Sequence, residues 1–381
     1  MAGSGPRKGH RKSRKGCSAC KRRRVKCDEV KPSCSACQRL DIACDYAVSS
    51  ARLLETSPAG IHRLSPTDRF DFDILDLGLL HHFTQCCCVK VPSQHRRDLW
   101  TGQVVKLAFE HRYVLDQLLA TSALHCMLIS PGKTHLYLPR ALLFRDRALR
   151  TVQPILQAMQ SEHSVAIFAF AGLAMIYSFA ERTIRADAEG PEYDPILHLV
   201  ECLQINRGIA TIVASQQTAI EGTWAKDLIQ MSSENDFHRL RVLHQKAGGA
   251  EVLHQMIDEH EPSAPRRAAA HDVLSVFTSN IQIIAWRGGQ DDIASHLIHS
   301  WTTHASSDFW LLLESQSPVA LALVAYFAAM ISLQPGFWWF EAWPAMLMTR
   351  IKSTLGEDWA PALKWPQELI DAHLGTLSCS E

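Results

Sequence analysis

Apolar side chains recur at helical spacing through most of the chain from residue 71 onward. Leu75, Leu79 and Phe83 are each four residues apart, as on the buried face of a helix, and strand-like alternation is rare. Further apolar stretches, separated by Gly, Pro and polar clusters, lie at 141–159, 164–180, 196–214, 237–257, 268–285, 292–301, 319–333 and 343–355. The pattern predicts an all-α domain of about twelve helices over residues 71–381.

The two most apolar runs, residues 165–177 and 319–331, are each 13 residues long. A helix needs roughly 20 apolar residues to cross a bilayer. We therefore expect both runs to be buried core helices of a soluble chain, with no membrane span.

The first 70 residues lack this helical pattern. Residues 1–16 (MAGSGPRKGHRKSRKG) have no apolar face, so we expect a disordered basic arm that serves as a nuclear-import signal, as extra phosphate contact, or as both. Residues 45–70 are rich in Ser, Pro and small residues and are expected to form a linker. The linker does not accommodate three or four heptads of a coiled coil.

Six cysteines lie between these two segments with a duplicated spacing, C-x2-C-x6-C-x6-C-x2-C-x6-C. Each Zn²⁺ takes about four tetrahedral ligands in a structural site, so two ions need two shared thiolates. The repeat favours Cys17 and Cys34 as the shared pair, with Cys20 and Cys27 completing one site and Cys37 and Cys44 the other. No coordination position remains open, which indicates structural rather than catalytic zinc.

Three alternatives fit the cysteines less well: three disulfides in a secreted mini-domain, a single-zinc ribbon with two spare cysteines, or a metal-storage segment. The amino terminus is polar and basic and lacks the apolar stretch that secretion requires. A reducing compartment favours metal binding over disulfides.

A basic run follows the second cysteine of the first half. A short helix held by the metal would present Lys21, Arg22, Arg23, Arg24 and Lys26 together. Arginine and lysine can donate to O6 and N7 of guanine, while neighbouring cations hold phosphates. A charge run is usually a solvated surface, but within this cysteine frame it predicts DNA binding.

This segment resembles the fungal Zn2Cys6 binuclear-cluster family of transcription regulators. The resemblance implies that Arg23 and Arg24, three and four places after the second cysteine, reach the bases of a CGG-like half-site. It also implies that Lys21, Arg22 and Lys26 mainly contact phosphate, with Arg39 doing related work in the second half. That half is less basic, and Pro32 before it agrees with the family pattern.

The charge distribution supports a nucleic-acid reader joined to a separate domain. Residues 1–50 hold 13 Lys and Arg against 4 Asp and Glu, a net charge of +9, and the remaining 331 residues carry 26 against 35, a net of −9. The formal net charge of zero is therefore the sum of a basic amino-terminal segment and an acidic body.

The start of the body, from Leu75 to Thr84, resembles the carboxy-terminal domain of the sterol-uptake-regulator type of zinc-cluster protein. Residues 118–125 and 166–171 extend the similarity. The resemblance implies a helical body that dimerises and senses a lipid. Because the linker lacks heptads, either single half-sites are bound or this body makes a homodimer.

Cysteines and histidines elsewhere in the body are candidates for metal binding or catalysis. Cys86, Cys87, Cys88, Cys126, Cys202 and Cys379 show no paired spacing, and His81, His82 and His125 lie among leucines, so we interpret both sets as packing residues. No catalytic or nucleotide-binding motif occurs, which argues against an enzyme.

Aromatic residues crowd the carboxy-terminal region. Trp338, Trp339, Trp343, Trp359 and Trp365 are five of the ten tryptophans in the chain. They could line an apolar ligand pocket or wedge the last helices against the bundle, and wedging is the favoured interpretation.

The sequence therefore predicts a nuclear, zinc-dependent, DNA-binding transcription regulator of RNA polymerase II genes, an activator in preference to a repressor or a ligand-independent factor. A sterol, lipid or secondary-metabolite gene set is the expected target. An all-α scaffold using the cluster for protein contacts is the alternative from another class.

Overall fold

The computed structural model describes residues 17–30, 34–40, 42, 44, 72–88, 94–158, 160–229, 250–287, 301–302, 305–333 and 337–377. The basic arm 1–16, the linker 45–70, Pro32, Cys379 and the predicted helical residues 237–249 and 292–300 lie outside these ranges. The chain divides into two compact units, Met1–Asp71 and Phe72–Glu381, and each is described by itself. Within the described residues, all regular secondary structure is helical.

The first unit contains two very short helices, α1 (Ser18–Arg22) and α2 (Ser35–Gln38). Its core consists of the six cysteines and Ala19, with Ala36 packed against them. So small a core supplies little hydrophobic stabilisation, because burying a methyl or thiol group contributes only about 1 kcal/mol. The stability of this unit must therefore come from bonds that the cysteines make through a bound metal.

The second unit is a helical body, and its amino-terminal half contains the following elements: α4 (Ile74–His82), the π-helix η2 (Phe83–Cys87), α5 (Gln94–Asp98), the π-helix η3 (Leu99–Val104), α6 (Val105–Glu110), α7 (Arg112–Ile129), the 3-10 helix η4 (Pro131–Lys133), α8 (Thr134–Ala158), the 3-10 helix η5 (Ser161–His163), α9 (Ser164–Ala180), α10 (Arg182–Glu189) and the 3-10 helix η6 (Gly190–Glu192). The carboxy-terminal half contains α11 (Pro195–Ser215), α12 (Gln217–Glu221), α13 (Lys226–Ile229), α15 (Glu251–His260), α16 (Ala264–Arg287), α18 (Ser307–Glu314), α19 (Pro318–Ser332), the 3-10 helix η7 (Trp338–Phe340), α20 (Trp343–Leu355), the 3-10 helix η8 (Glu357–Trp359) and α21 (Ala360–Leu377).

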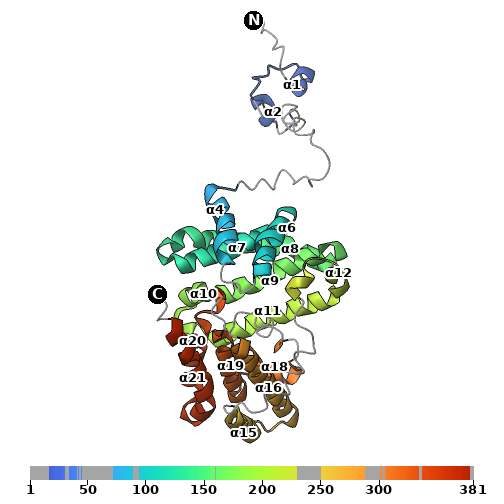
Figure 1. The fold of residues 1–381 in the computed structure, drawn as a ribbon. Helices are drawn as coiled ribbons and strands as arrows, with labels where there is room; N and C mark the ends of the chain where they lie inside the picture. Colours follow the sequence, from blue (N-terminus) through green and yellow to red (C-terminus); the bar gives the residue numbers. More distant parts are fainter. Residues whose placement is uncertain are drawn as a thin grey trace, which may run out of the picture. The chain divides into compact units, whose positions relative to one another are not determined.

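Two almost completely buried helices organise the body. Every residue of α7 from Tyr113 to Met127 is buried, and so is every residue of α19 from Val319 to Ile331. A helix that is buried around its whole circumference must be covered by other elements on all sides. Helices α8, α9, α4 and α6 pack around α7, while α16, α20, α21 and α15 pack around α19 (Figure 1).

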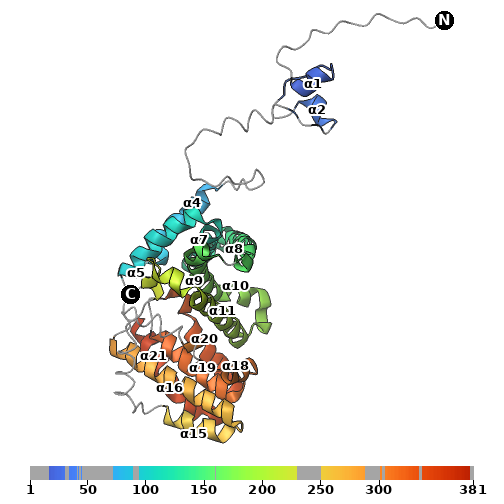
Figure 2. The same ribbon diagram turned by 90° about the vertical axis from the view of Figure 1, so that its right-hand side faces the viewer.

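Helices α9 and α11 pack against each other between these two groups (Figure 2). The indole N–H of Trp343 in α20 donates to the carbonyl of Phe179 at the end of α9, over 2.9 Å. Trp338 donates in the same way to the carbonyl of Cys87, over 3.2 Å. The aromatic region thus ties the carboxy-terminal helices to α9 and η2, as expected for a wedge.

The all-helical fold class is confirmed, but the predicted number of helices was wrong. Sixteen α-helices occur in the described part of the body rather than about twelve, because short helices such as α5, α12 and α13 are too brief to show apolar periodicity. The segment Ser161–Ala180 forms a continuous 20-residue helix that is long and apolar enough to cross a bilayer. Its most apolar 18-residue window is 61% buried inside the body, as in a core helix.

A buried charge holds α7 against α8. The Asp116 side chain is 1% exposed, yet it pairs with Arg112 one turn before it and with Arg147 of α8. Two arginines compensate the carboxylate, because a buried unpaired charge would cost several kcal/mol.

His198 of α11 makes stability of the body dependent on pH. Burial lowers the pKa of His198 to about 4, and its ring bonds the Ser178 carbonyl (3.0 Å) and the Tyr193 hydroxyl (2.9 Å). The unfolded chain protonates this histidine near pH 6.5, so the stabilisation is present above pH 6.5 and is lost as pH falls toward 4. Lowering pH from 7 to 5 should cost about 2 kcal/mol through this residue. Denaturant unfolding of His198→Gln should show an acid dependence weaker by that amount, and an unchanged dependence would contradict the assignment.

Candidate metal centre and nucleic-acid interface

The two halves of the cysteine repeat fold alike. Cys17 is the N-cap of α1 and Cys34 the N-cap of α2, and the second cysteine of each pair lies three residues later in the first helical turn. Residues three apart on a helix share a face. Each C-x2-C pair therefore presents two sulfurs in one direction, and the backbone N–H of Cys20 also reaches the Cys17 sulfur at 3.4 Å.

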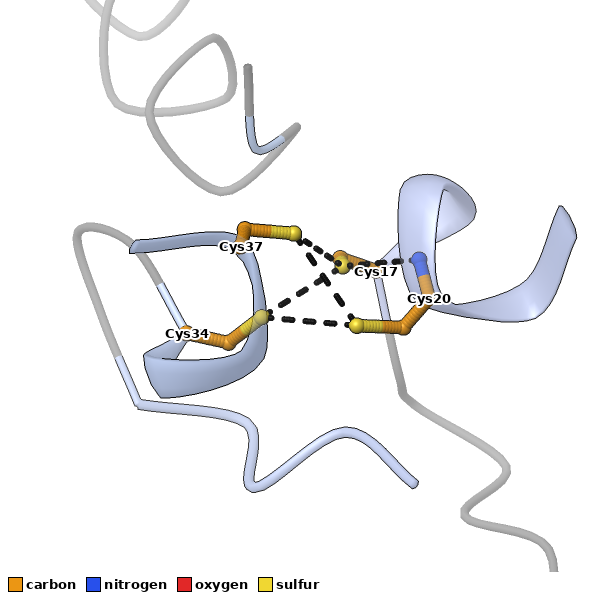
Figure 3. A group of neighbouring side chains, drawn as sticks. All are labelled: Cys17, Cys20, Cys34 and Cys37. Carbon is orange, nitrogen blue, oxygen red and sulfur yellow. Dashed lines mark hydrogen bonds between the residues drawn. The ribbon is translucent and has the colours of Figure 1, made fainter. Parts of the chain in front are cut away.

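Four sulfur atoms from the two halves meet in the centre of this unit (Figure 3). The Cys17 sulfur lies 3.7 Å from those of Cys34 and Cys37, and the Cys20 sulfur lies 3.5 Å from Cys34 and 3.9 Å from Cys37. A zinc ion with Zn–S bonds of about 2.3 Å sets its sulfurs about 3.8 Å apart. The donor set and its spacing therefore fit tetrahedral zinc.

The remaining two cysteines are buried in the same core. Cys27 groups with Asp28 and Cys34 as a further set of potential ligands within 4.8 Å of one another, and Cys44 is 3% exposed. Cys34 thus belongs to both groups of potential ligands, which is the position a shared ligand requires.

Burial raises the pKa of the Cys17 thiol to about 12 and also raises the pKa of Cys34 and Cys37. Without a cation these thiols keep their protons at neutral pH. Zinc binding must displace the protons, so metal affinity should fall as pH decreases.

Five of the six predicted DNA-contacting residues are exposed at the surface of this unit: Lys21, Arg22, Arg24, Lys26 and Arg39. Arg23 differs, because its side chain is half-buried and its Nη2 donates to the Ala36 carbonyl in the other half, over 3.2 Å. The structure therefore places Arg23 as a link between the halves. Contact of Arg23 with a base would require this hydrogen bond to open.

Helix α1 ends in an unusual way at Arg24. The Arg24 N–H bonds the Lys21 carbonyl (3.2 Å) and the Val25 N–H bonds the Cys20 carbonyl (3.1 Å), the hydrogen-bond pattern of a Schellman end. Arg24 has φ of 54°, a left-handed conformation in which glycine is usual. Backbone strain of this kind is concentrated at functional sites.

Asp28 is a structural residue that the sequence interpretation missed. Its carboxylate accepts from the backbone N–H of Ser35 at 3.2 Å, and this interaction lowers the pKa of Asp28. The bond ties the loop after Cys27 to the start of α2. Sequence offers no signal for it, because the partner is a backbone group seven residues away.

The aromatic region of the body borders a hollow. Phe83, Cys87, Cys88, Trp100, Thr121, Ile176, Trp338 and Trp339 line it, and its volume is about 300 Å³ including space open to solvent. Trp343, by contrast, is fully buried outside this lining and acts as packing.

Known families match both units. Residues 15–53 match the fungal Zn(2)-Cys(6) binuclear cluster domain, and residues 78–210 match the fungal specific transcription factor domain. Both matched domains are those of the fungal Zn2Cys6 transcription factor family. A cluster domain of this family binds two zinc ions, and these proteins are DNA-binding transcription factors rather than enzymes.

Two relatives illustrate this similarity. The Zn(2)-C6 fungal-type transcription factor afumD of Aspergillus fumigatus is 37% identical over 142 residues, which cover 35% of this chain and only 37% of that relative. A Zn(2)-C6 fungal-type transcription factor of Gibberella zeae is 24% identical over 433 residues, covering 95% of this chain and 86% of that protein. The second alignment extends through both units.

Proposed function

We propose that this Zn2Cys6 protein is a nuclear activator of RNA polymerase II genes that reads a CGG-like half-site through residues 17–44. The observation that carries the proposal is the convergence of the sulfurs of Cys17, Cys20, Cys34 and Cys37. These sulfurs fix the position of α1, which directly precedes an exposed basic turn. Similarity to domains of fungal transcription factors supports action in the nucleus. The proposal of a sterol, lipid or secondary-metabolite gene set rests only on the resemblance of the body to the sterol-uptake-regulator type. Expression of a reporter gene that carries the DNA site would distinguish activation from repression.

The six cysteines are proposed to hold two zinc ions, with Cys17 and Cys34 shared. Cys20 and Cys27 would complete one site, and Cys37 and Cys44 the other. Cys20 and Cys37, now 3.9 Å apart, would bind different ions under this assignment, so metal loading should separate them. Zinc supplies folding energy and fixes the direction of α1.

Arg24 is the strongest candidate for base contact, with Arg23 as the second. The Arg24 side chain is exposed, and Arg24 occupies the left-handed turn at the end of α1. Lys21, Arg22, Lys26 and Arg39 are proposed to hold phosphates, which fixes the orientation of the unit on DNA.

Three variants test this division of roles. Arg24→Ala should lower affinity for a CGG duplex about 10- to 100-fold and leave affinity for random DNA nearly unchanged, because one bidentate guanine contact is worth about 1–3 kcal/mol. Arg22→Ala should weaken binding to both duplexes alike and reduce its salt dependence. The measurement is fluorescence anisotropy at several salt concentrations.

Arg24→Gly is the matched control for folding. Glycine adopts the left-handed conformation without strain, so this variant should bind zinc and fold at least as well as the wild type. We expect it to bind the CGG duplex as weakly as Arg24→Ala. Wild-type affinity in Arg24→Gly would rule out base reading by this arginine.

Control by a small apolar ligand is a second proposal, which rests on the hollow beside Trp338 and Trp339. Trp339 is 6% exposed, and its indole N–H has no hydrogen-bond partner among the described residues. Buried tryptophan N–H groups usually have an acceptor, which a ligand could provide. Trp339→Phe should abolish an inducer response while leaving the melting temperature nearly unchanged, and an unchanged response would exclude this site.

A further inference from the structure

Three potential metal ligands converge inside the helical body. His82 Nε2 lies 2.8 Å from His125 Nδ1, and the Cys87 sulfur lies 3.5 Å from that same His125 nitrogen. All three ligand atoms lie within 4.8 Å of one another. The sequence interpretation treated these residues as packing, because no paired spacing connects them.

A π-helix brings the first two residues together. His82 ends α4 and caps η2, and Cys87 is the last residue of η2. In a π-helix the hydrogen bonds join residues five apart, so the side chains of His82 and Cys87 lie on one side, as they would not in an α-helix. His125, in the buried helix α7, completes the group from the facing element. Single-turn π-helices are frequent at functional sites.

Hydrogen bonds alone do not fully satisfy the three side chains in this arrangement. A neutral imidazole nitrogen carries either one hydrogen or one lone pair. Nδ1 of His125 therefore cannot form full hydrogen bonds to both His82 and Cys87. A cation at the centre of the three atoms would engage a lone pair from each of them.

The surroundings restrict these side chains. Cys87 is 5% exposed and His125 9% exposed, while His82 is half-buried. The Trp338 ring packs against His125 with centroids 4.6 Å apart, and its N–H donates to the Cys87 carbonyl. Ligands held in place by such packing lose little freedom on binding a metal.

We propose that His82, Cys87 and His125 form a zinc site in the regulatory body, separate from the six-cysteine cluster. Two imidazoles and one thiolate suit a borderline cation such as Zn²⁺. With Zn–N bonds of about 2.0–2.1 Å the two nitrogens would lie about 3.4 Å apart, so His82 must retreat by about 0.6 Å. The Cys87 proton is lost to solvent on binding, and water from the adjoining hollow takes the fourth position.

Zinc bound here would fasten α4 and η2 to α7. Helix α4 is the first helix of the body, and the boundary between the two units directly precedes Phe72. Occupancy of the site therefore stabilises the segment at which the body begins. This gives the regulatory body a means to respond to zinc that does not depend on the DNA-binding unit.

The test compares zinc content of the full-length protein and four variants after equilibration in a zinc buffer and gel filtration. Wild type should retain one zinc ion more than His82→Gln and one more than Cys87→Ser. The neighbours His81 and Cys86 are exposed and outside the group, so His81→Gln and Cys86→Ser are matched controls that should retain the wild-type content. Helix content by circular dichroism confirms folding of each variant.

Cobalt substitution provides a second readout that needs no folded variant. Co²⁺ added to protein whose cluster already holds zinc should give the thiolate charge-transfer and tetrahedral d–d absorption of one additional site. A wild type holding only the cluster zinc and showing no such bands would overturn the proposal. Extra zinc that persists in both His82→Gln and Cys87→Ser would place the ion elsewhere and overturn it as well.

Discussion

Chelation of zinc should unfold residues 17–44 and abolish DNA binding while the helical body stays folded. The core of the first unit is made of the cysteines and one alanine, so removal of the metal leaves almost no apolar surface to stabilise it. The body has an extensive core of its own around α7 and α19. Because α1 and α2 contribute only five and four helical residues, far-ultraviolet circular dichroism should change little.

Cys34→Ser provides the genetic counterpart of chelation. Loss of the proposed shared ligand should remove DNA binding entirely, whereas Cys86→Ser, at an exposed thiol of the body, should preserve it. Added zinc should restore binding to the chelated wild type and not to Cys34→Ser. Loss of most of the helical signal on chelation would contradict the independence of the two units.

Trp343→Ala should destabilise the body by about 3–5 kcal/mol, the usual cost of removing a buried tryptophan from a core. The Trp343 side chain is fully buried, its ring packs against Phe179 and His198, and its N–H bonds the Phe179 carbonyl. We expect the melting temperature of the body to fall by roughly 6–15 °C.

Two further substitutions calibrate that result. Trp343→Phe keeps most of the apolar contact and loses the hydrogen bond, so its cost should be about 1–2 kcal/mol. Trp365→Ala removes a half-buried ring that packs against Tyr326 and should cost less than Trp343→Ala. An unchanged melting temperature of Trp343→Ala would refute the assignment of Trp343 as a residue that packs the last helices against the rest of the body.

Much of the metal centre could be predicted from sequence. The C-x2-C spacing alone places two thiols on one face of a helical turn, and the repeat brings two such pairs together, as the sulfurs of Cys17, Cys20, Cys34 and Cys37 show. The hydrogen bond from Arg23 to Ala36 could not be predicted, because it depends on how the two halves fold onto each other. Arg23 and Arg24 are adjacent in sequence, yet one links the halves and the other is exposed.

In the body, apolar periodicity predicted the fold class and the buried character of residues 319–331. It failed where local geometry departs from a regular α-helix. No sequence pattern predicts the π-helix that places His82 and Cys87 on the same side. The role of Asp116 was equally hidden, because its arginine partner Arg147 belongs to the next long helix, 31 residues away.

The most direct test of the central claim is selection of bound sequences from a random DNA pool by the full-length protein, zinc-loaded, alongside Arg24→Gly. The wild type should enrich a CGG-containing element, and Arg24→Gly should bind zinc but enrich none. Paired elements would also indicate that the full-length protein binds as a dimer. If the zinc-loaded wild type enriches no sequence, the cluster serves protein contacts instead, and the account of a DNA-reading unit is wrong.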